Sequence, residues 1–194
     1  MALPQDTQTN AQRVLILYWS ATGNTEKVAK AIERGARRAG ASPSVMKIAD
    51  AADLDLHEYD LVFMGAPSHS FLPPEPVLRY VKDRMRYHRE RGDIKPRAPK
   101  IPGKRAVVFV TYSGPHTGID EAIPVGKYLG QFLAHLGFEV LDEWYVVGEF
   151  HGNEVNSTQG RLGDIRCRPN AEDLARIEQQ TIEACYVRDA GRGG

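Results

Sequence analysis

The sequence has few of the features that would place it outside the ordinary globular proteins. Its 194 residues include only two cysteines, Cys167 and Cys185, which are too few for a disulfide framework and lack the spacing of a metal site. The 25 basic and 25 acidic side chains give a formal net charge of zero, whereas a general nucleic-acid-binding protein needs clustered excess Lys and Arg. We therefore expect reduced thiols and no nucleic-acid partner.

Long apolar runs are also missing. No segment approaches the roughly 18 apolar residues that a bilayer-spanning helix requires, so we expect no membrane insertion. The opening residues, MALPQDTQTNAQR, contain no apolar stretch of the signal-peptide type. We therefore expect a cytoplasmic protein. The hydrophobic content of 42% is ordinary for a globular chain that buries a core.

Apolar runs alternate with helical patterns along the chain. Short continuous apolar runs are typical of strands buried on both faces of a parallel sheet, and apolar residues at helical spacing indicate the helices that cover it. This alternation predicts an α/β fold with a doubly wound sheet, in a single domain over 13–186 with flexible termini at 1–12 and 187–194. The expected strands lie near 14–18, 44–48, 61–64, 106–110 and 138–147, and the expected helices near 24–39, 77–85, 125–136 and 170–182.

The most informative segment, YWSATGNT from Tyr18 to Thr25, joins the first strand to the first helix. A helix start offers unpaired backbone N–H groups and a partial positive charge. Ser20, Thr22 and Thr25 add hydroxyl donors, and Gly23 allows the backbone to approach a ligand closely. Together these groups predict a binding site for a phosphate monoester. A capped helix start would explain the segment without a ligand, but capping needs fewer hydroxyls.

Two other kinds of phosphate-binding loop are excluded by the same residues. The ATP-binding loop requires a Gly-Lys-Ser/Thr sequence, and no Lys stands in that place here. The dinucleotide-binding loop requires three spaced glycines, and this segment has one. The segment therefore fits a terminal monophosphate that is held but not transferred.

The stretch YWSATGNTEKVAKAI resembles the opening of the flavodoxins, whose Ser/Thr-x-Thr-Gly-x-Thr loop holds the phosphate of FMN. A looser resemblance in the order of strands and helices extends over about 13–186. It implies a flavodoxin-like fold, a five-stranded parallel sheet in the order 2-1-3-4-5, with FMN at the carboxyl ends of the strands, where open α/β sheets bind ligands. The phosphate contacts that it implies are Ser20, Ala21, Thr22, Gly23, Asn24 and Thr25.

Two further loops leave predicted strands at the same edge of the sheet, and the resemblance implies that they hold the flavin ring. Phe71 and Tyr112 are candidates to stack on that ring, although ordinary loop packing explains them equally well. His69 and His116 are candidates to hydrogen-bond the flavin or a substrate, although a loop histidine is more often simply solvated. The residues expected around the ring are Pro67, Ser68, His69, Ser70 and Phe71, and Thr111, Tyr112, Ser113, Gly114, His116 and Gly118.

The first of these loops departs from the pattern of short flavodoxins, in which a glycine peptide flips toward the reduced flavin. No glycine follows Gly65 within the loop, and Pro67 removes both a donor and backbone freedom. A flip to positive φ is less favourable at Ser68 or His69 than at glycine. We therefore expect weak stabilisation of the one-electron-reduced flavin. No catalytic residue is assigned, and no ligand spacing around the loop histidines indicates a metal site.

Two long segments stand out from the ordinary connections. The segment 86–105 carries eight basic and two acidic residues, and if it lay near the flavin it could steer NADPH or an acidic partner. The segment 148–169 is polar and rich in glycine, and it could cover the flavin or contact a neighbouring subunit. Whether the protein is a monomer or a homo-oligomer is left open by these features.

Three functions are consistent with the sequence. The first, which we prefer from the sequence alone, is an FMN protein that transfers electrons to a partner redox protein, with the cofactor supplying the chemistry. The second is an FMN-dependent NAD(P)H oxidoreductase that reduces a quinone or a similar small acceptor, which the histidine-bearing loops and the 148–169 segment favour. The third is a non-redox binding module, which the complete phosphate loop disfavours.

Overall fold

A computed structural model describes residues 12–187 of the protein, so the expected flexible termini lie almost wholly outside the described residues. The strands are β1 (Arg13–Tyr18), β2 (Ser42–Lys47), β3 (Leu61–Pro67), β4 (Arg105–Tyr112) and β5 (Glu139–Val147). The helices are α1 (Asn24–Arg38), α2 (Glu75–Glu90), α3 (Ile123–His135), α4 (Glu154–Thr158) and α5 (Ala171–Tyr186).

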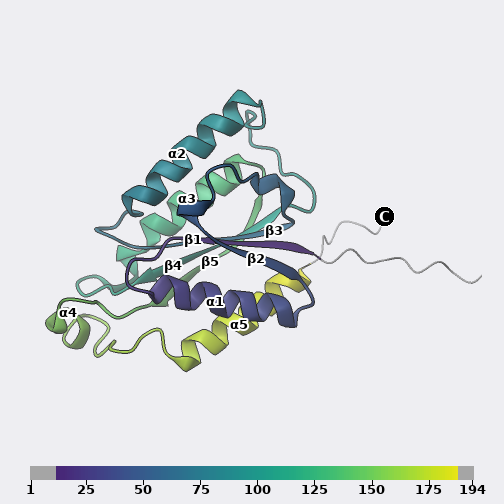
Figure 1. Ribbon diagram of the computed structural model, residues 1–194. Helices are drawn as coiled ribbons and strands as arrows, with labels where there is room; N and C mark the ends of the chain where they lie inside the picture. The colour runs from purple at the N-terminus through teal and green to yellow at the C-terminus, as the bar shows by residue number, and fades with distance from the viewer. Residues whose placement is uncertain (1–11, 188–194) are drawn as a thin grey trace, which may run out of the picture.

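The five strands form one parallel sheet in the order β2-β1-β3-β4-β5, which confirms the predicted fold class and strand order. Helices α1 and α5 cover one face of the sheet, and α2 and α3 cover the other (Figure 1). Because all strands run in one direction, the loops that follow β1, β3 and β4 emerge at the same edge. The chain order reverses between β1 and β3, and such a switch point is where open α/β sheets bind ligands.

Burial explains why the central strands were predicted well and one edge strand less well. All eight residues of β4 are buried, so its sequence is the near-continuous apolar run of a strand covered on both faces. Strand β2 has no fully buried residue and contains Pro43, as suits an edge strand. Its span is therefore shifted from the predicted 44–48, and Ile48 begins a short 3-10 turn.

Helices α1 and α5 lie in close contact through Gly35. A Cβ added at Gly35 would lie 2.6 Å from the Glu178 carbonyl oxygen and 2.7 Å from the Thr181 Cβ. The backbone oxygen and the buried threonine cannot both move aside without separating the helices.

We expect Gly35→Ala to lower the free energy of unfolding by about 1–3 kcal/mol because it overfills this contact. The matched change Gly130→Ala, in α3, would meet the Glu143 carboxylate at 3.3 Å, the end of a flexible side chain, and the Val140 side chain at an ordinary contact distance of 4.0 Å. That variant should be unchanged or stabilised by up to about 1 kcal/mol, since alanine favours a helix interior. Urea denaturation of both variants tests the pair, and equal losses of stability would contradict the packing argument.

Candidate functional site

Loops from four strands meet at the carboxyl edge of the sheet around two adjoining cavities. The first has a volume of about 160 Å³ and is lined by the turn after β1 and by the loops after β3, β4 and β5. The second has a volume of about 290 Å³ and is lined by the last three of these loops. Both cavities share Ser68, Tyr112, Ser113 and Phe150. The segments predicted to hold a phosphate and a flat ring therefore face one continuous region.

The turn before α1 begins the helix without a side-chain cap. Gly23 is the N-cap residue with φ 96°, and no side chain accepts from the first helical N–H groups. Ser20 Oγ accepts a hydrogen bond from the Gly23 N–H at 3.1 Å and so closes the turn on itself. Helix α5, by contrast, has a complete capping box between Asn170 and Asp173, and its N-cap was predicted from the sequence. Capping therefore does not explain the hydroxyl-rich turn, and an uncapped helix start of this kind favours binding of an anion.

Two buried contacts hold this turn in place. Thr25 Oγ1 and Thr111 Oγ1 lie 2.7 Å apart and join the start of α1 to the end of β4. Asn24 Nδ2 donates to the Glu149 carbonyl oxygen at 3.1 Å, whereas the buried Asn24 Oδ1 has no hydrogen-bond partner within the described residues. A Cβ at Gly148 would lie 2.8 Å from Asn24 Nδ2, so glycine is needed there for the close approach.

The placement of the predicted phosphate residues is consistent with an FMN phosphate. Five of the six line the first cavity, and Gly23 instead shapes the turn through its left-handed backbone. A Cβ at Gly23 would meet nothing within 4 Å, so the conformation rather than space requires glycine. The five are Ser20, Ala21, Thr22, Asn24 and Thr25.

The loop after β3 ends in a tight turn. The N–H of His69 donates to the Leu72 carbonyl at 3.0 Å, and the N–H of Leu72 donates back at 3.1 Å. Ser70 and Phe71 occupy the centre with φ 48° and 68°, so the left-handed conformations fall there rather than at Ser68. The turn places the Phe71 side chain, which is 54% exposed, at the rim of the second cavity. Weak stabilisation of the one-electron-reduced flavin stays a prediction.

His69 lies between the turn and the first cavity. Its ring meets the Trp19 ring edge-on, with 5.7 Å between centroids, and lines the first cavity together with Pro67 and Ser68. Desolvation lowers the pKa of His69 below its ordinary value. The imidazole is therefore neutral at pH 7, with one nitrogen able to donate a hydrogen bond and the other able to accept one.

The loop after β4 is braced by the carboxylate of Glu121. Its Oε1 accepts from the backbone N–H of His116 at 2.9 Å and of Thr117 at 2.7 Å, while its carbonyl accepts from Ser68 Oγ. A Cβ at Gly114 would lie 2.5 Å from the Gly118 carbonyl oxygen. The loop is thus folded tightly on itself.

Most of the predicted residues of this loop face a cavity. Thr111 lines the first cavity, Tyr112 and Ser113 line both, and Gly114 and His116 line the second. Gly118, also predicted as a contact, lines neither and instead closes the loop. Tyr112 is nearly buried, and burial raises the pKa of its phenol.

The segment after β5 supplies cavity residues that were not singled out from the sequence. Ser113 Oγ donates to the Gly148 carbonyl at 2.8 Å. Ser157 in α4 accepts from the N–H of Phe150 and donates to its carbonyl. The length and glycine content of 148–169 marked the segment but gave no signal for individual contacts. The missed residues from this segment are Gly148, Glu149, Phe150 and His151 in the first cavity, and Phe150 and Asn156 in the second. Two residues of the loop after β4, Pro115 and Glu121, also line the second cavity and were missed.

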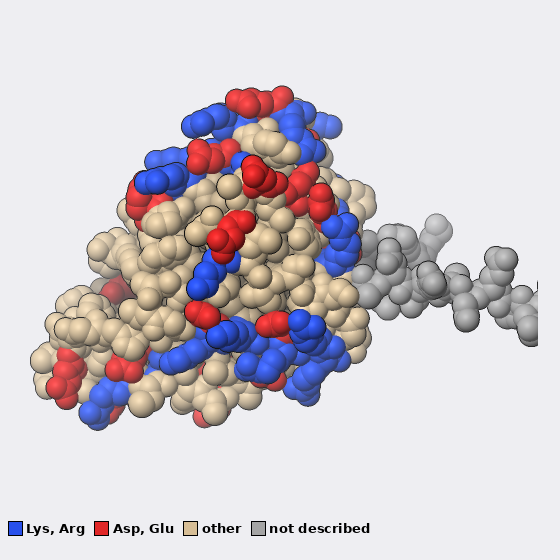
Figure 2. Space-filling view, in the orientation of Figure 1, with Lys and Arg blue, Asp and Glu red and all other residues tan. Residues whose placement is uncertain are grey.

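The basic segment 86–105 lies at the opposite edge of the sheet from these cavities. It runs from the end of α2 to the start of β4, and Arg105 pairs in register with Leu61 at the amino end of β3. Basic and acidic side chains are interspersed at the top of the molecule, where α2 ends (Figure 1 and Figure 2). Within the segment, Arg91 contacts the carboxylates of Asp55 and Asp93. The segment therefore does not lie near the predicted flavin site, and the condition for steering a ligand there is not met.

Comparison with known proteins decides the family. A family profile described as "Flavodoxin" matches residues 16–176. The chain belongs to the flavodoxin family. An "NAD(P)H dehydrogenase (quinone)" of Caulobacter vibrioides is 34% identical to this flavodoxin-family chain, covering 91% of it and 98% of the relative. A protein of the same description from Archaeoglobus fulgidus is 26% identical over 72% of this chain and 83% of its own.

Other relatives of this flavodoxin-family protein carry the name flavodoxin itself. The flavodoxin of Megasphaera elsdenii is 31% identical over 51% of this chain and 64% of its own. The solved structure of oxidised flavodoxin 1 from Bacillus cereus superposes with a TM-score of 0.61 at 20% identity, covering 88% and 95% of the two chains. The predicted family is confirmed, and a flavodoxin-like redox function follows from it.

Among the described residues, none of the helices combines the length and apolarity that a membrane crossing demands.

Proposed function

We propose that the protein is an FMN-dependent NAD(P)H oxidoreductase that reduces a quinone or a similar small acceptor. The turn Ser20–Thr25 would hold the FMN phosphate, and the loops after β3 and β4 would hold the ring. When bound, FMN would supply hydride acceptance from NAD(P)H and transfer of two electrons to the acceptor. The observation that carries the proposal is the second cavity, which adjoins the phosphate turn's cavity and is walled by the segment after β5.

The second cavity suits a planar, partly apolar acceptor. Phe71 and Phe150 stand at its rim with 54% and 37% of their surfaces exposed, and Tyr112 lies within it. Aromatic faces favour stacking with a flat ring, and His116 offers a polar contact at its edge. The similarity to two relatives named as quinone dehydrogenases, one of them matched over 91% of this chain and 98% of its own length, supports the same activity.

The loop histidines are suited to managing protons during quinone reduction, which requires protons as well as electrons. Neutral His69 offers both a donor and an acceptor near the cavity that the flavin ring would share. His116 lies exposed in the second cavity, with its backbone fixed by Glu121. These side chains would hydrogen-bond the acceptor's oxygens and exchange protons with solvent.

Electron transfer to a partner redox protein is the second candidate. The observation that favours it is the exposed apolar rim at Phe71, Leu72 and Phe150, because a partner protein would cover such a surface as well as a quinone would. The match to a relative named flavodoxin supports it.

Anaerobic NAD(P)H oxidation by the FMN-loaded protein separates the two candidates. The proposed reductase should oxidise NADH or NADPH catalytically when benzoquinone is added and should stop after one turnover without it. An electron carrier would show negligible oxidation under both conditions while still being reduced by dithionite. That second result would overturn the reductase proposal but not FMN binding.

Phe71→Ala should lower kcat/KM for benzoquinone about tenfold, because the variant removes an aromatic face from the second cavity. The variant and its control are assayed at saturating FMN, because the loop after β3 would also hold the flavin ring. The matched control is Leu72→Ala, in which an equally exposed apolar side chain that lines neither cavity is removed. Equal kinetic effects of the two variants would place the acceptor elsewhere.

A further inference from the structure

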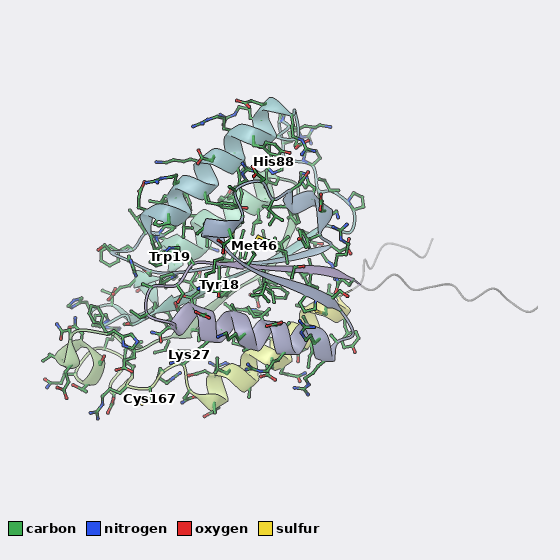
Figure 3. The ribbon with its side chains drawn as sticks, in the orientation of Figure 1. Tyr18, Trp19, Lys27, Met46, His88 and Cys167 are labelled. Carbon is green, nitrogen blue, oxygen red and sulfur yellow. The ribbon has the colours of Figure 1, made fainter. Side chains whose placement is uncertain are left out.

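A cluster of metal-ligating side chains lies at the amino edge of the sheet, away from the proposed flavin site. Asp55, His57 and His88 each offer one ligand atom, and these atoms lie within 4.8 Å of one another. Asp55 and His57 belong to the short turn before β3, and His88 lies in the last turn of α2. Figure 3 places His88 far from Trp19, which follows β1 at the other edge.

His88 has one ring nitrogen without a partner. The side chain is fully buried, and its Nδ1 lies 2.8 Å from Asp93 Oδ2. The buried Nε2 has no hydrogen-bond partner within the described residues. An unpaired buried polar atom destabilises a fold by about 1–3 kcal/mol, so such an atom requires an explanation, and a bound ion is one.

The His57 ring is also held through one of its two nitrogens. Its Nε2 lies 2.8 Å from the Leu136 carbonyl oxygen, and its ring stacks on Phe138 with 5.6 Å between centroids. Its other nitrogen, Nδ1, lies 3.8 Å from Asp55 Oδ1, which is too long for a hydrogen bond. Both histidines thus place one nitrogen beside an oxygen acceptor and leave the other without a hydrogen bond among the described residues. Metal-ligating histidines show this arrangement, because the outer bond fixes the tautomer and ring orientation.

We propose that Asp55 Oδ1, His57 Nδ1 and His88 Nε2 bind a divalent transition-metal ion of the Zn²⁺ class. Two imidazoles and one carboxylate suit Zn²⁺, with water in a fourth position. Neighbouring ligands on a tetrahedral Zn²⁺ lie about 3.3 Å apart, so ligand atoms that lie within 4.8 Å of one another reach that spacing when each pair closes by at most about 1.5 Å.

The surroundings of the cluster favour a cation. The carboxylates of Asp55 and Asp93 face a single guanidinium, that of Arg91, which donates to Asp55 Oδ2 at 2.7 Å and leaves Oδ1 toward His57. Among the described residues, these two carboxylates outnumber the one guanidinium that contacts them. A cavity of about 190 Å³, lined by His57, Asp93 and His135 among others, adjoins the cluster and gives an entry path.

Zinc titration of the FMN-loaded protein tests the site. The protein is treated with EDTA, desalted and titrated with Zn²⁺ against a chromophoric chelator, in a Cys167→Ser background that removes the exposed thiol. We expect about one tightly bound equivalent, and a loss of affinity of at least about 100-fold in His57→Gln and in His88→Gln. Asp93→Asn should weaken binding by about 10- to 100-fold, because it removes the outer partner of His88.

The matched control is His135→Gln, which removes an exposed imidazole from the same cavity and should leave zinc affinity unchanged. No tight equivalent in the wild type, or equal affinity in His57→Gln and His135→Gln, would overturn the proposal. Because buried His88→Gln can fail to fold, the half-buried His57 provides the decisive variant. Imidazole NMR signals of His57 and His88 that shift together on adding Zn²⁺ to the wild type would support the site, and unshifted signals would contradict it.

Discussion

The double variant Ser20→Ala, Thr22→Val should bind FMN about a hundredfold to ten-thousandfold more weakly than the wild type. Each hydroxyl would donate one hydrogen bond to the phosphate dianion, and such charge-assisted bonds contribute about 1.5–3 kcal/mol each. Ser20 Oγ also accepts from the Gly23 N–H, so its removal loosens the turn that presents the backbone donors. Fluorescence titration of the apoprotein with FMN measures the change.

The matched control for this variant removes two exposed hydroxyls at the edge strand β2, in Ser42→Ala, Ser44→Ala. It should bind FMN as the wild type does. Thermal unfolding of the apoproteins shows whether the phosphate-turn variant remains folded. A folded double variant with unchanged FMN affinity would mean that the turn does not hold the phosphate.

Asp173→Asn should lower the free energy of unfolding at pH 7 by about 1–3 kcal/mol, because it removes a nearly buried carboxylate from charge-assisted hydrogen bonds with Arg168, whose side chain is 29% exposed. The carboxylate is 3% exposed, accepts from Arg168 Nη2 at 2.6 Å and closes the capping box of α5. The carbonyl of Arg168 in turn accepts from the N–H of Glu149, which lines the first cavity. The ion pair therefore anchors the wall of the proposed flavin site as well as the helix.

The effect of Asp173→Asn should depend on pH in a defined direction. Burial alone would raise the pKa of this carboxyl, but the Arg168 guanidinium and the Asn170 N–H outweigh it and hold the pKa below its ordinary value. A lowered folded-state pKa stabilises the protein above the unfolded-state value of about 3.9, and this stabilisation is lost as the pH falls through the folded pKa. Urea denaturation from pH 7 to pH 3 should show the difference from wild type shrinking below about pH 4. The exposed Asp53→Asn should show little difference throughout, and a constant difference for Asp173→Asn would contradict the ion-pair account.

The parts of the fold that could be predicted from the sequence are those with a clear local pattern of apolar or polar residues. Strand β4 is buried along its whole length, and its apolar run was recognised as a buried strand. The N-cap at Asn170 was predicted because an asparagine before an apolar periodic segment satisfies helix N–H groups. The phosphate turn was located because its hydroxyls and glycine occupy consecutive positions between a strand and a helix.

Features that depend on long-range contacts were not predicted. Phe150 lines both cavities because the Ser157 hydroxyl holds its backbone. No short sequence motif indicates that contact. The basic charge of 86–105 was evident from composition, but its position at the far edge follows from the direction of α2. The cluster of His57 and His88 is assembled only when the end of α2 meets the turn before β3.

The most direct test of the account compares FMN with riboflavin as ligands of the wild-type apoprotein. The two differ by the phosphate alone, so the ratio of their dissociation constants isolates what the turn at Ser20–Thr25 contributes. The account predicts that FMN binds at least about a thousandfold more tightly, since two or more charge-assisted hydrogen bonds would be lost with riboflavin. Equal affinities, or binding of neither ligand, would contradict the assignment of this turn as a phosphate site.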